Sequence, residues 1–222
     1  ALLSAADVFW AAEREHWPAS QAALYDQQLR GLRLELWLAR EDFACADAWL
    51  DAHHAELAVD DYCGLLTGYV QRLAERGRHA QAEDALRRGL RHYPEQPNLY
   101  QQQAELAELQ GRLPQAMSLL QRAIHLAGQQ QKMMLPLRLK LASVTTQSYP
   151  ELARKMAEQA IGEAGALTPS PAMDAAQIGL WQAQAQVTLA GVDTQEQQYT
   201  GAQMRYVEVL QAHPRLVPAL QG

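Results

Sequence analysis

The sequence predicts an all-α protein, an α-solenoid of antiparallel helix pairs, and two observations support this fold class. The first is composition: 48% of the 222 residues are apolar, only 2 are Phe, and the abundant Ala, Leu, Gln, Glu and Arg favour helices. The second is an internal repeat. Residues 77–82 (GRHAQA) and 111–116 (GRLPQA) share four of six residues at an offset of 34. Such a chain is expected to bury its core between stacked helical units.

Each copy of this repeat has the features of two helices joined by a tight turn. Apolar residues before the turn recur at three- and four-residue spacing, which predicts one helical stripe. They are Leu66, Tyr69, Val70 and Leu73. Gly77 ends this helix, because glycine accepts the left-handed conformation of a C-terminal cap. In the second helix, Ala82 and Gly89 lie two turns apart and let a neighbouring helix come close, and Pro94 stops the helix. The next copy repeats the pattern from Gly111 onward.

Residues 63–96 and 97–130 each resemble the tetratricopeptide repeat (TPR), a 34-residue helix–turn–helix unit. The second copy departs from the family's pattern at Gly128, where a proline usually closes the unit, and at Gln103, where an apolar residue is usual. The resemblance implies a TPR-like superhelix, with about eleven helices in this chain, whose first helices line a concave groove. It also implies a protein–protein interaction scaffold that binds a peptide or protein partner in that groove.

Outside residues 63–130 the repeat diverges. We expect one domain over residues 1–222, with further units at about 27–60, 134–167 and 172–214, and one more helix over residues 4–17. At 27–60, residues 41–43 are interpreted as the turn and Ala46 as a small residue of the second helix; an alternative register uses Ala48 and Ala55. Because the residues from Pro214 onward resemble the junction to another unit, we expect a fragment of a longer chain.

Charge and hydropathy argue against two kinds of partner. The net charge is −6, with −8 over residues 1–61, +5 over 62–140 and −3 over 141–222. An acidic chain with a pI of 5.6 is not expected to bind nucleic acid. No apolar run is long enough to span a membrane and no signal segment opens the sequence, so direct membrane insertion is not expected. The Ala, Arg and Gln content resembles that of bacterial repeats, which makes a bacterial soluble compartment our guess; the oligomeric state stays open.

The residues capable of catalysis or metal binding form no recognisable motif. His53 and His54 are adjacent and therefore point to different helix faces, which makes a shared metal ion unfavourable. Cys45 and Cys63 lie 18 residues apart and are expected to be buried free thiols. We therefore predict no enzyme activity, no cofactor and no metal. The alternative function is a regulatory or sensor repeat domain attached to a catalytic or DNA-binding domain in a longer polypeptide.

The candidate partner-binding surface consists of polar side chains on the first helices, away from their apolar stripe. They are Thr67, Gln71, Gln101, Gln102, Glu105 and Glu108. Stacked repeats would bring these amides and carboxylates into one groove, which suits an extended peptide backbone or a partner with Lys or Arg. The corresponding face has no cation, so a carboxylate-terminated tail is a poor ligand. The simpler alternative is that these are solvated helix residues; the basic helix bearing Arg87, Arg88 and Arg91 is then the next candidate.

Overall fold

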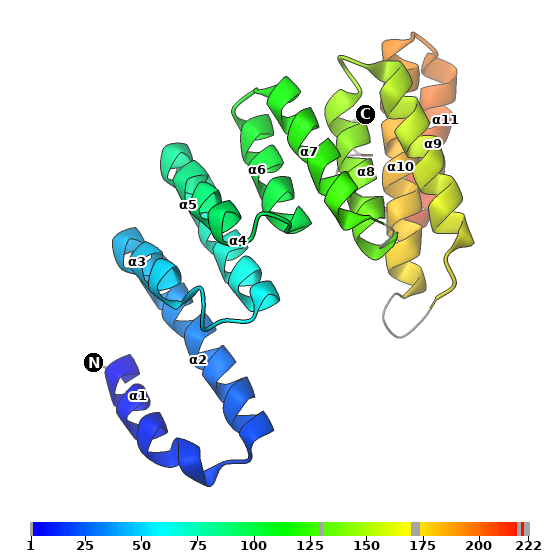
Figure 1. Ribbon diagram of the computed structural model, residues 1–222. Coiled ribbons are helices and arrows are strands. Elements are labelled where there is room, and N and C mark those ends of the chain that lie inside the picture. The colour runs from blue at the N-terminus through cyan, green and yellow to red at the C-terminus, as the bar shows by residue number, and fades with distance from the viewer. Residues whose placement is uncertain (1, 129–130, 170–173, 217–218, 220–222) are drawn as a thin grey trace. The chain divides into compact units, whose positions relative to one another are not determined.

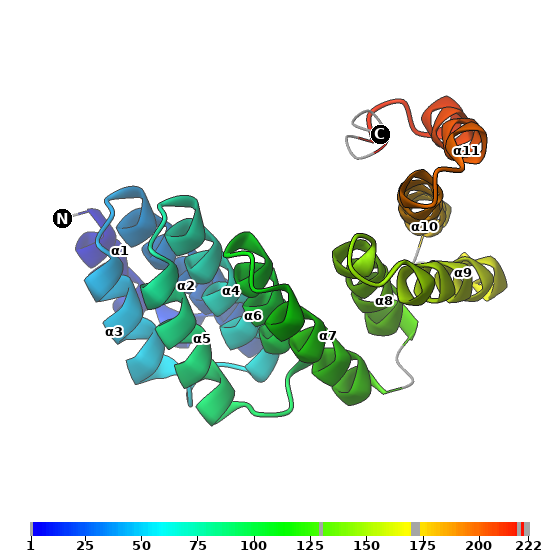
Figure 2. The ribbon, with the colours of Figure 1, turned by 90° about the horizontal axis from the view of Figure 1, so that it is seen from above.

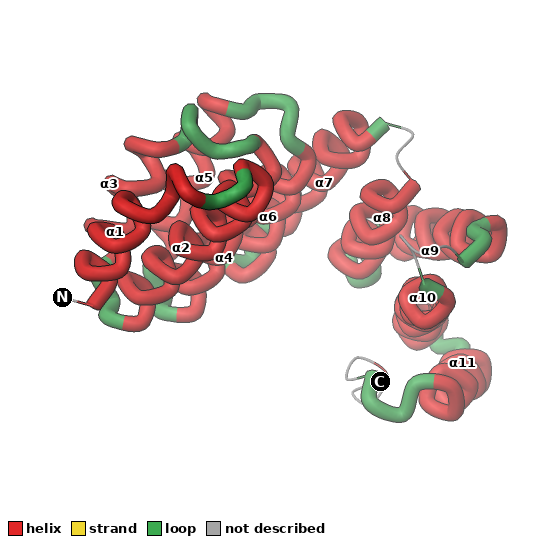
Figure 3. Tube along the Cα trace, turned by 90° about the horizontal axis from the view of Figure 1, so that it is seen from below, coloured by secondary structure: helices red, strands yellow, loops and turns green. Residues whose placement is uncertain are grey.

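The computed structural model describes residues 2–128, 131–169, 174–216 and 219, which form helices joined by turns and loops (Figures 1 and 3). Helices make up 82% of these residues, and no strand occurs among them. The residues form two compact units, Ala1–Pro94 (unit 1) and Glu95–Gly222 (unit 2). The predicted all-α fold class is therefore confirmed.

Unit 1 consists of an N-terminal helix followed by two helix pairs. The N-terminal part is α1 (Leu2–Glu13) with a 3₁₀ helix (Arg14–His16); the pairs are α2 (Ala19–Ala39) with α3 (Phe43–His53), and α4 (Val59–Glu75) with α5 (His79–His92). Seen from above, the first helices α2 and α4 form one layer of this unit and the second helices α3 and α5 form the other (Figure 2). The helix expected over residues 4–17 corresponds to α1 and the 3₁₀ turn.

Unit 2 consists of three helix pairs. They are α6 (Pro97–Leu109) with α7 (Leu113–Ala127), α8 (Gln131–Thr145) with α9 (Pro150–Ala166), and α10 (Ala175–Gln195) with α11 (Tyr199–Ala212). Pro136 lies inside α8, where it removes one backbone donor from the helix. Over the described part of the chain this gives eleven α-helices, as the sequence predicts.

The turn inside a pair repeats one backbone geometry in four of the five pairs. A residue with positive φ follows the first helix at Glu41 (57°), Gly77 (70°), Gly111 (72°) and Gln197 (63°). The next residue then donates its N–H to the carbonyl five positions back, as Arg78 N does to Leu73 O at 2.8 Å. This bond satisfies a carbonyl that the end of the helix leaves unpaired. The predicted role of Gly77 is therefore confirmed.

A small buried residue follows each of these four turn residues five positions later. The four are Ala46, Ala82, Ala116 and Ala202, whose exposed fractions are 0, 0, 0 and 3%. Ala48 and Ala55 are exposed. The register that uses Ala46 for residues 27–60 is therefore correct and the alternative is wrong. Because alanine has no atoms beyond Cβ, each second helix can approach its neighbours closely at this position.

The core of unit 2 combines leucines with alanines. In one cluster the fully buried Leu120 of α7 packs among small residues of α6 and α7, which include Ala104, Ala107, Ala116 and Ala123. A second cluster joins α8, α9 and α10 around Trp181. Large side chains therefore fill spaces that the alanines leave open.

A charged network connects the last three helices of unit 2. Asp193 of α10 is only 3% exposed and accepts from Arg154 of α9 at 3.0 Å and from Arg205 of α11 at 2.9 Å. Arg154 also pairs with Glu196 at 2.7 Å, and Arg205 donates to Gln186 at 2.7 Å. Burial disfavours the charge of Arg154, but the hydrogen bonds to Asp193 and Glu196 outweigh it and raise its pKa. The network fixes three helices around one buried carboxylate.

The two cysteines have different environments. Cys63 is 3% exposed, and burial raises the pKa of its thiol to about 11. Cys45 is exposed, so its expected burial is wrong. The reason is the register of α3, in which Ala46 rather than Cys45 faces the core. The hydrogen bond with Asp42 raises the pKa of the Cys45 thiol.

Replacing Gln197 with glycine should raise the free energy of unfolding by about 0.5–1 kcal/mol, because a residue with a Cβ is strained at positive φ. The Gln197 side chain is exposed, so this change removes no core packing. The matched reverse substitution, Gly111→Ala, should lower stability by a similar amount. Urea unfolding of both variants measures the effect, and two changes of the same sign would contradict the equivalence of the turns.

Candidate functional site

Thr67 and Gln71 lie on α4 in unit 1, half-buried and exposed respectively. They lie beside Gly64 and Gly68 on the same helix. Gly31 of α2 corresponds to Thr67, because each lies ten positions before the turn residue of its pair, Glu41 or Gly77. A Cβ added at any of these three glycines would meet no atom within 4 Å. Glycine inside a helix costs about 0.5–1 kcal/mol relative to alanine, and no packing among the described residues accounts for that cost here. This face of α2 and α4 in unit 1 therefore has three positions with no side chain and with open space beside them, and we call it the open glycine face.

The other four predicted residues lie together on α6 in unit 2. Gln101 and Gln102 each donate to one oxygen of Glu105, at 3.0 and 3.1 Å. Glu108 pairs with Lys140 of α8 at 2.6 Å. The structure thus connects α6 to the next first helix and adds Lys140, which was missed. The expectation that this face has no cation is wrong, because Lys140 of α8 lies beside Glu108. The sequence did not show this, since α8 belongs to a divergent repeat.

A pocket lies between the first helices α8 and α10, and we call it the α8–α10 pocket. Its volume is ≈ 320 Å³. It is lined by Pro136, Leu139, Lys140, Ser143, Gln184, Val187, Thr188 and Leu216. Apolar groups thus form much of the wall. The polar groups beside them are the ammonium of Lys140 and the hydroxyl of Ser143 from α8, and the amide of Gln184 and the hydroxyl of Thr188 from α10. Such a combination accepts an apolar side chain and offers hydrogen bonds to the backbone on either side of it.

Several residues that line the pocket correspond in repeat position to the predicted residues Gln101, Gln102 and Glu105 of α6. The burial pattern aligns the three helices. Ala104 and Ala107 of α6 are buried, as are Ala142 and Thr145 of α8 at an offset of 38. Ala190 and Asp193 of α10 are buried at an offset of 86 from α6. With these offsets, Gln101, Gln102 and Glu105 correspond to Leu139, Lys140 and Ser143 in α8 and to Val187, Thr188 and Gly191 in α10. The two later helices approach closely at Gly191, where an added Cβ would lie 3.3 Å from Thr146. The three first helices of unit 2 therefore present one face.

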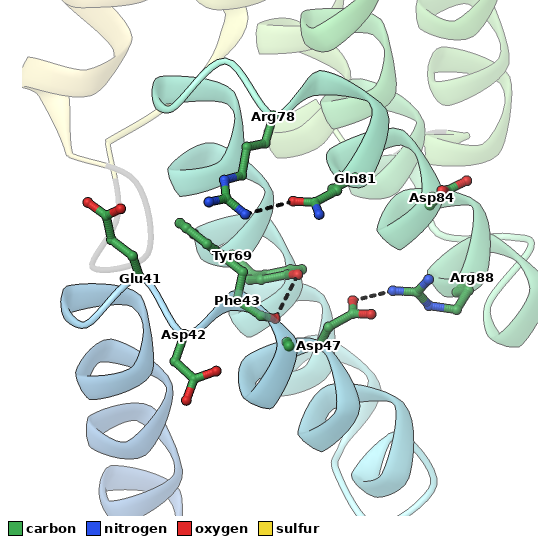
Figure 4. A pocket seen from close by; sticks show the side chains of 10 residues that line it. Glu41, Asp42, Phe43, Asp47, Tyr69, Arg78, Gln81, Asp84 and Arg88 are labelled. Carbon is green, nitrogen blue, oxygen red and sulfur yellow. Dashed lines mark hydrogen bonds and ion pairs between the residues drawn. The ribbon is translucent and has the colours of Figure 1, made fainter.

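A second pocket, of ≈ 400 Å³, lies in unit 1 among α3, α4, α5 and the turn before α3 (Figure 4). Its charged groups are largely paired with one another or with near neighbours. Arg88 pairs with Asp47, and Arg78 lies 4.6 Å from the centre of the Phe43 ring. Burial raises the pKa of Tyr69, which stays protonated and donates to the carbonyl of Phe43 at 3.2 Å. These contacts hold α3 against α4 and α5, so the groups around this pocket already serve the packing of the helices.

The adjacent histidines point to different neighbours, as predicted. His53 stacks on Trp49 and its Nδ1 lies 2.9 Å from the Trp49 carbonyl oxygen. His54 stacks on His92, with 3.7 Å between the ring centres. In the part of the chain that the structure describes, no group of three or more His, Cys, Asp or Glu side chains could hold a metal ion.

Comparison with solved structures places the fold among helical-repeat proteins. BtubC (BKLC) from P. vanneervenii is 16% identical with a TM-score of 0.64, and the match covers 100% of this chain and 93% of that one. A Podosopora anserina protein described as a kinesin light chain with nearly identical TPR-like repeats is 14% identical with a TM-score of 0.59, over 85% and 96% of the chains. YrrB, a TPR protein with an unusual peptide-binding site, is 14% identical with a TM-score of 0.51, over 92% and 97%.

The stacked helix pairs define a helical-repeat scaffold. Residues 64–106 match the family model of the tetratricopeptide repeat. Residues 64–106 therefore belong to the tetratricopeptide repeat, and the helix pairs on either side have the same kind of fold. No curated protein sequence matches it. None of the helices in the described ranges is long and apolar enough to cross a membrane.

Proposed function

We propose that the protein is a non-catalytic scaffold that binds an extended peptide segment of a partner protein on the first-helix face of unit 2. An apolar side chain of that segment enters the α8–α10 pocket. Gln184 and Ser143 hydrogen-bond its backbone, and Gln101, Gln102, Glu105 and Glu108 of α6 contact the segment farther along. Thr67 and Gln71 offer a similar polar face in unit 1.

The observation that carries this proposal is the pocket itself. It combines apolar walls with polar groups, and among these Lys140 and Thr188 correspond in position to Gln102 of α6 and Ser143 corresponds to Glu105. Its volume of ≈ 320 Å³ suits one large side chain rather than a folded surface. The fold of YrrB, which has a peptide-binding site, supports the same use of a TPR array. By contrast, four charged groups around the unit 1 pocket, those of Glu41, Asp47, Asp84 and Arg88, are already in ion pairs.

Selection from a displayed library of random peptides tests the proposal. Peptides enriched on the wild-type chain should bind Gln184→Trp roughly tenfold or more weakly, because the indole occupies the space of the ligand side chain. Gln184 is exposed, so the substitution leaves the core intact.

The matched control is Gln203→Trp, since Gln203 is equally exposed but lies on the second helix α11. It should bind the selected peptides as the wild type does. Equal binding by both variants would show that the pocket is not the site, and a failure to enrich any peptide would argue against peptide binding altogether.

A further inference from the structure

We infer that the preferred ligand carries a basic residue, Lys or Arg, about four positions away from the apolar residue that enters the α8–α10 pocket. This inference rests on the proposed function and names the chemistry of the peptide. It follows from one unneutralised carboxylate on α6 and from the spacing of the first helices.

Three charged groups of the described residues lie together on this face: Glu105, Glu108 and Lys140. Glu108 and Lys140 neutralise each other at 2.6 Å. Among the residues placed in the structure, Glu105 has only the amide donors Gln101 and Gln102 as hydrogen-bond partners and no ion pair. Among the side chains that the structure describes, one negative charge therefore remains on this face.

The two amides also orient this carboxylate. Gln101 binds Oε1 and Gln102 binds Oε2, so both oxygens of Glu105 are held in place. Each oxygen keeps a further lone pair as acceptor, because a carboxylate offers about four acceptor sites. Lys or Arg of a ligand can therefore add a charge-assisted hydrogen bond without breaking the existing ones. A ligand carboxylate at this point would instead face repulsion.

The distance between Glu105 and the pocket sets the spacing of the ligand residues. Glu105 lies on α6, whereas the pocket lies between α8 and α10, which is one and a half helix spacings away. Glu108, one turn from Glu105 on α6, reaches Lys140 in the pocket wall at 2.6 Å, so α6 and α8 are within side-chain reach of each other. With a helix spacing of about 8–10 Å, the distance from Glu105 to the pocket is roughly 12–15 Å. An extended chain advances about 3.3 Å per residue, which makes the separation about four residues.

Capped synthetic peptides test this inference by fluorescence polarisation against the intact chain. The reference peptide has Lys and Leu four positions apart in a Ser/Thr background; one variant replaces its Lys with Glu and another replaces its Leu with Ser. The wild-type chain should bind the Lys peptide about fivefold more tightly than the Glu peptide at low salt, and this preference should shrink as salt is added. The Glu105→Gln chain should lose the preference, while Glu158→Gln, an exposed acid on α9, should keep it.

The outcomes separate the inference from the proposed function. If Leu→Ser in the peptide and Gln184→Trp in the chain weaken binding but the Lys preference is missing or survives in Glu105→Gln, the basic residue is wrong and the pocket stands. If the Lys preference appears without any dependence on Leu or on Gln184, the pocket is wrong. Tighter binding of the Glu peptide, or no binding of any peptide at millimolar concentration, would overturn the inference directly.

Discussion

Replacing Asp193 with alanine should lower the free energy of unfolding by about 3–5 kcal/mol, the largest effect we expect from a single substitution in this chain. The carboxylate is 3% exposed and is the shared acceptor for Arg154 and Arg205. Its removal leaves two partly buried guanidinium groups with only Glu196, the second partner of Arg154, to balance their charges. Urea unfolding followed by circular dichroism measures the loss.

Two further variants separate the charge of Asp193 from its position. Asp193→Asn keeps an acceptor but not the charge, so its stability should lie between those of the wild type and the alanine variant. Glu208→Ala removes an exposed acid of α11 and should change stability by no more than about 0.5 kcal/mol. A loss below about 1 kcal/mol for Asp193→Ala would mean that solvent replaces the carboxylate and that the network is not structural.

Replacing Leu120 with alanine should cost about 2–5 kcal/mol of stability, because it leaves a cavity that the surroundings cannot fill. Leu120 is fully buried, and many of its neighbours are alanines, which have no flexible atoms to move into the space. The flexible side chains packed against this cluster, Met117, Met134 and Met156, lie at its edge, so closing the space fully would also require helices to shift. The effect should therefore lie toward the upper end of the range, and a thermal melt with a urea titration checks it.

Leu109→Ala provides the matched control, because Leu109 of α6 is 69% exposed in the same unit. This substitution deletes the same atoms but opens no cavity, so a change within about 0.5 kcal/mol is expected. If the two variants were equally stable, helices α6 and α7 would have to be able to close over the missing side chain.

The helix pairs could be predicted from the sequence where glycine and alanine repeat at one offset. Gly77 and Gly111 define the turns because glycine alone adopts positive φ without strain. The same turn at Gln197 was not recognised, since a glutamine gives no local signal of that conformation. Its geometry is imposed by the helices on either side, which pack through Ala202 and the Asp193 network.

The candidate site could be predicted only in part, for a related reason. Gln101, Gln102 and Glu105 were found because they lie in the clear repeat. Their counterparts in α8 and α10 were missed because insertions lengthen the offset between successive first helices from 34 to 38 and then to 48. Helical periodicity does not show where an insertion lies. Lys140 meets Glu108 across two helices, a contact that depends on tertiary packing rather than on local pattern.

The open glycine face of unit 1 has a consequence for how binding there can be mapped. At Gly31, Gly64 and Gly68 every substitution adds atoms, and the structure has free space for a methyl group at each. Alanine there should strengthen the helix while narrowing the room for anything that docks on it. Stability and affinity would then change in opposite directions, so a loss of binding at these positions could not be attributed to unfolding.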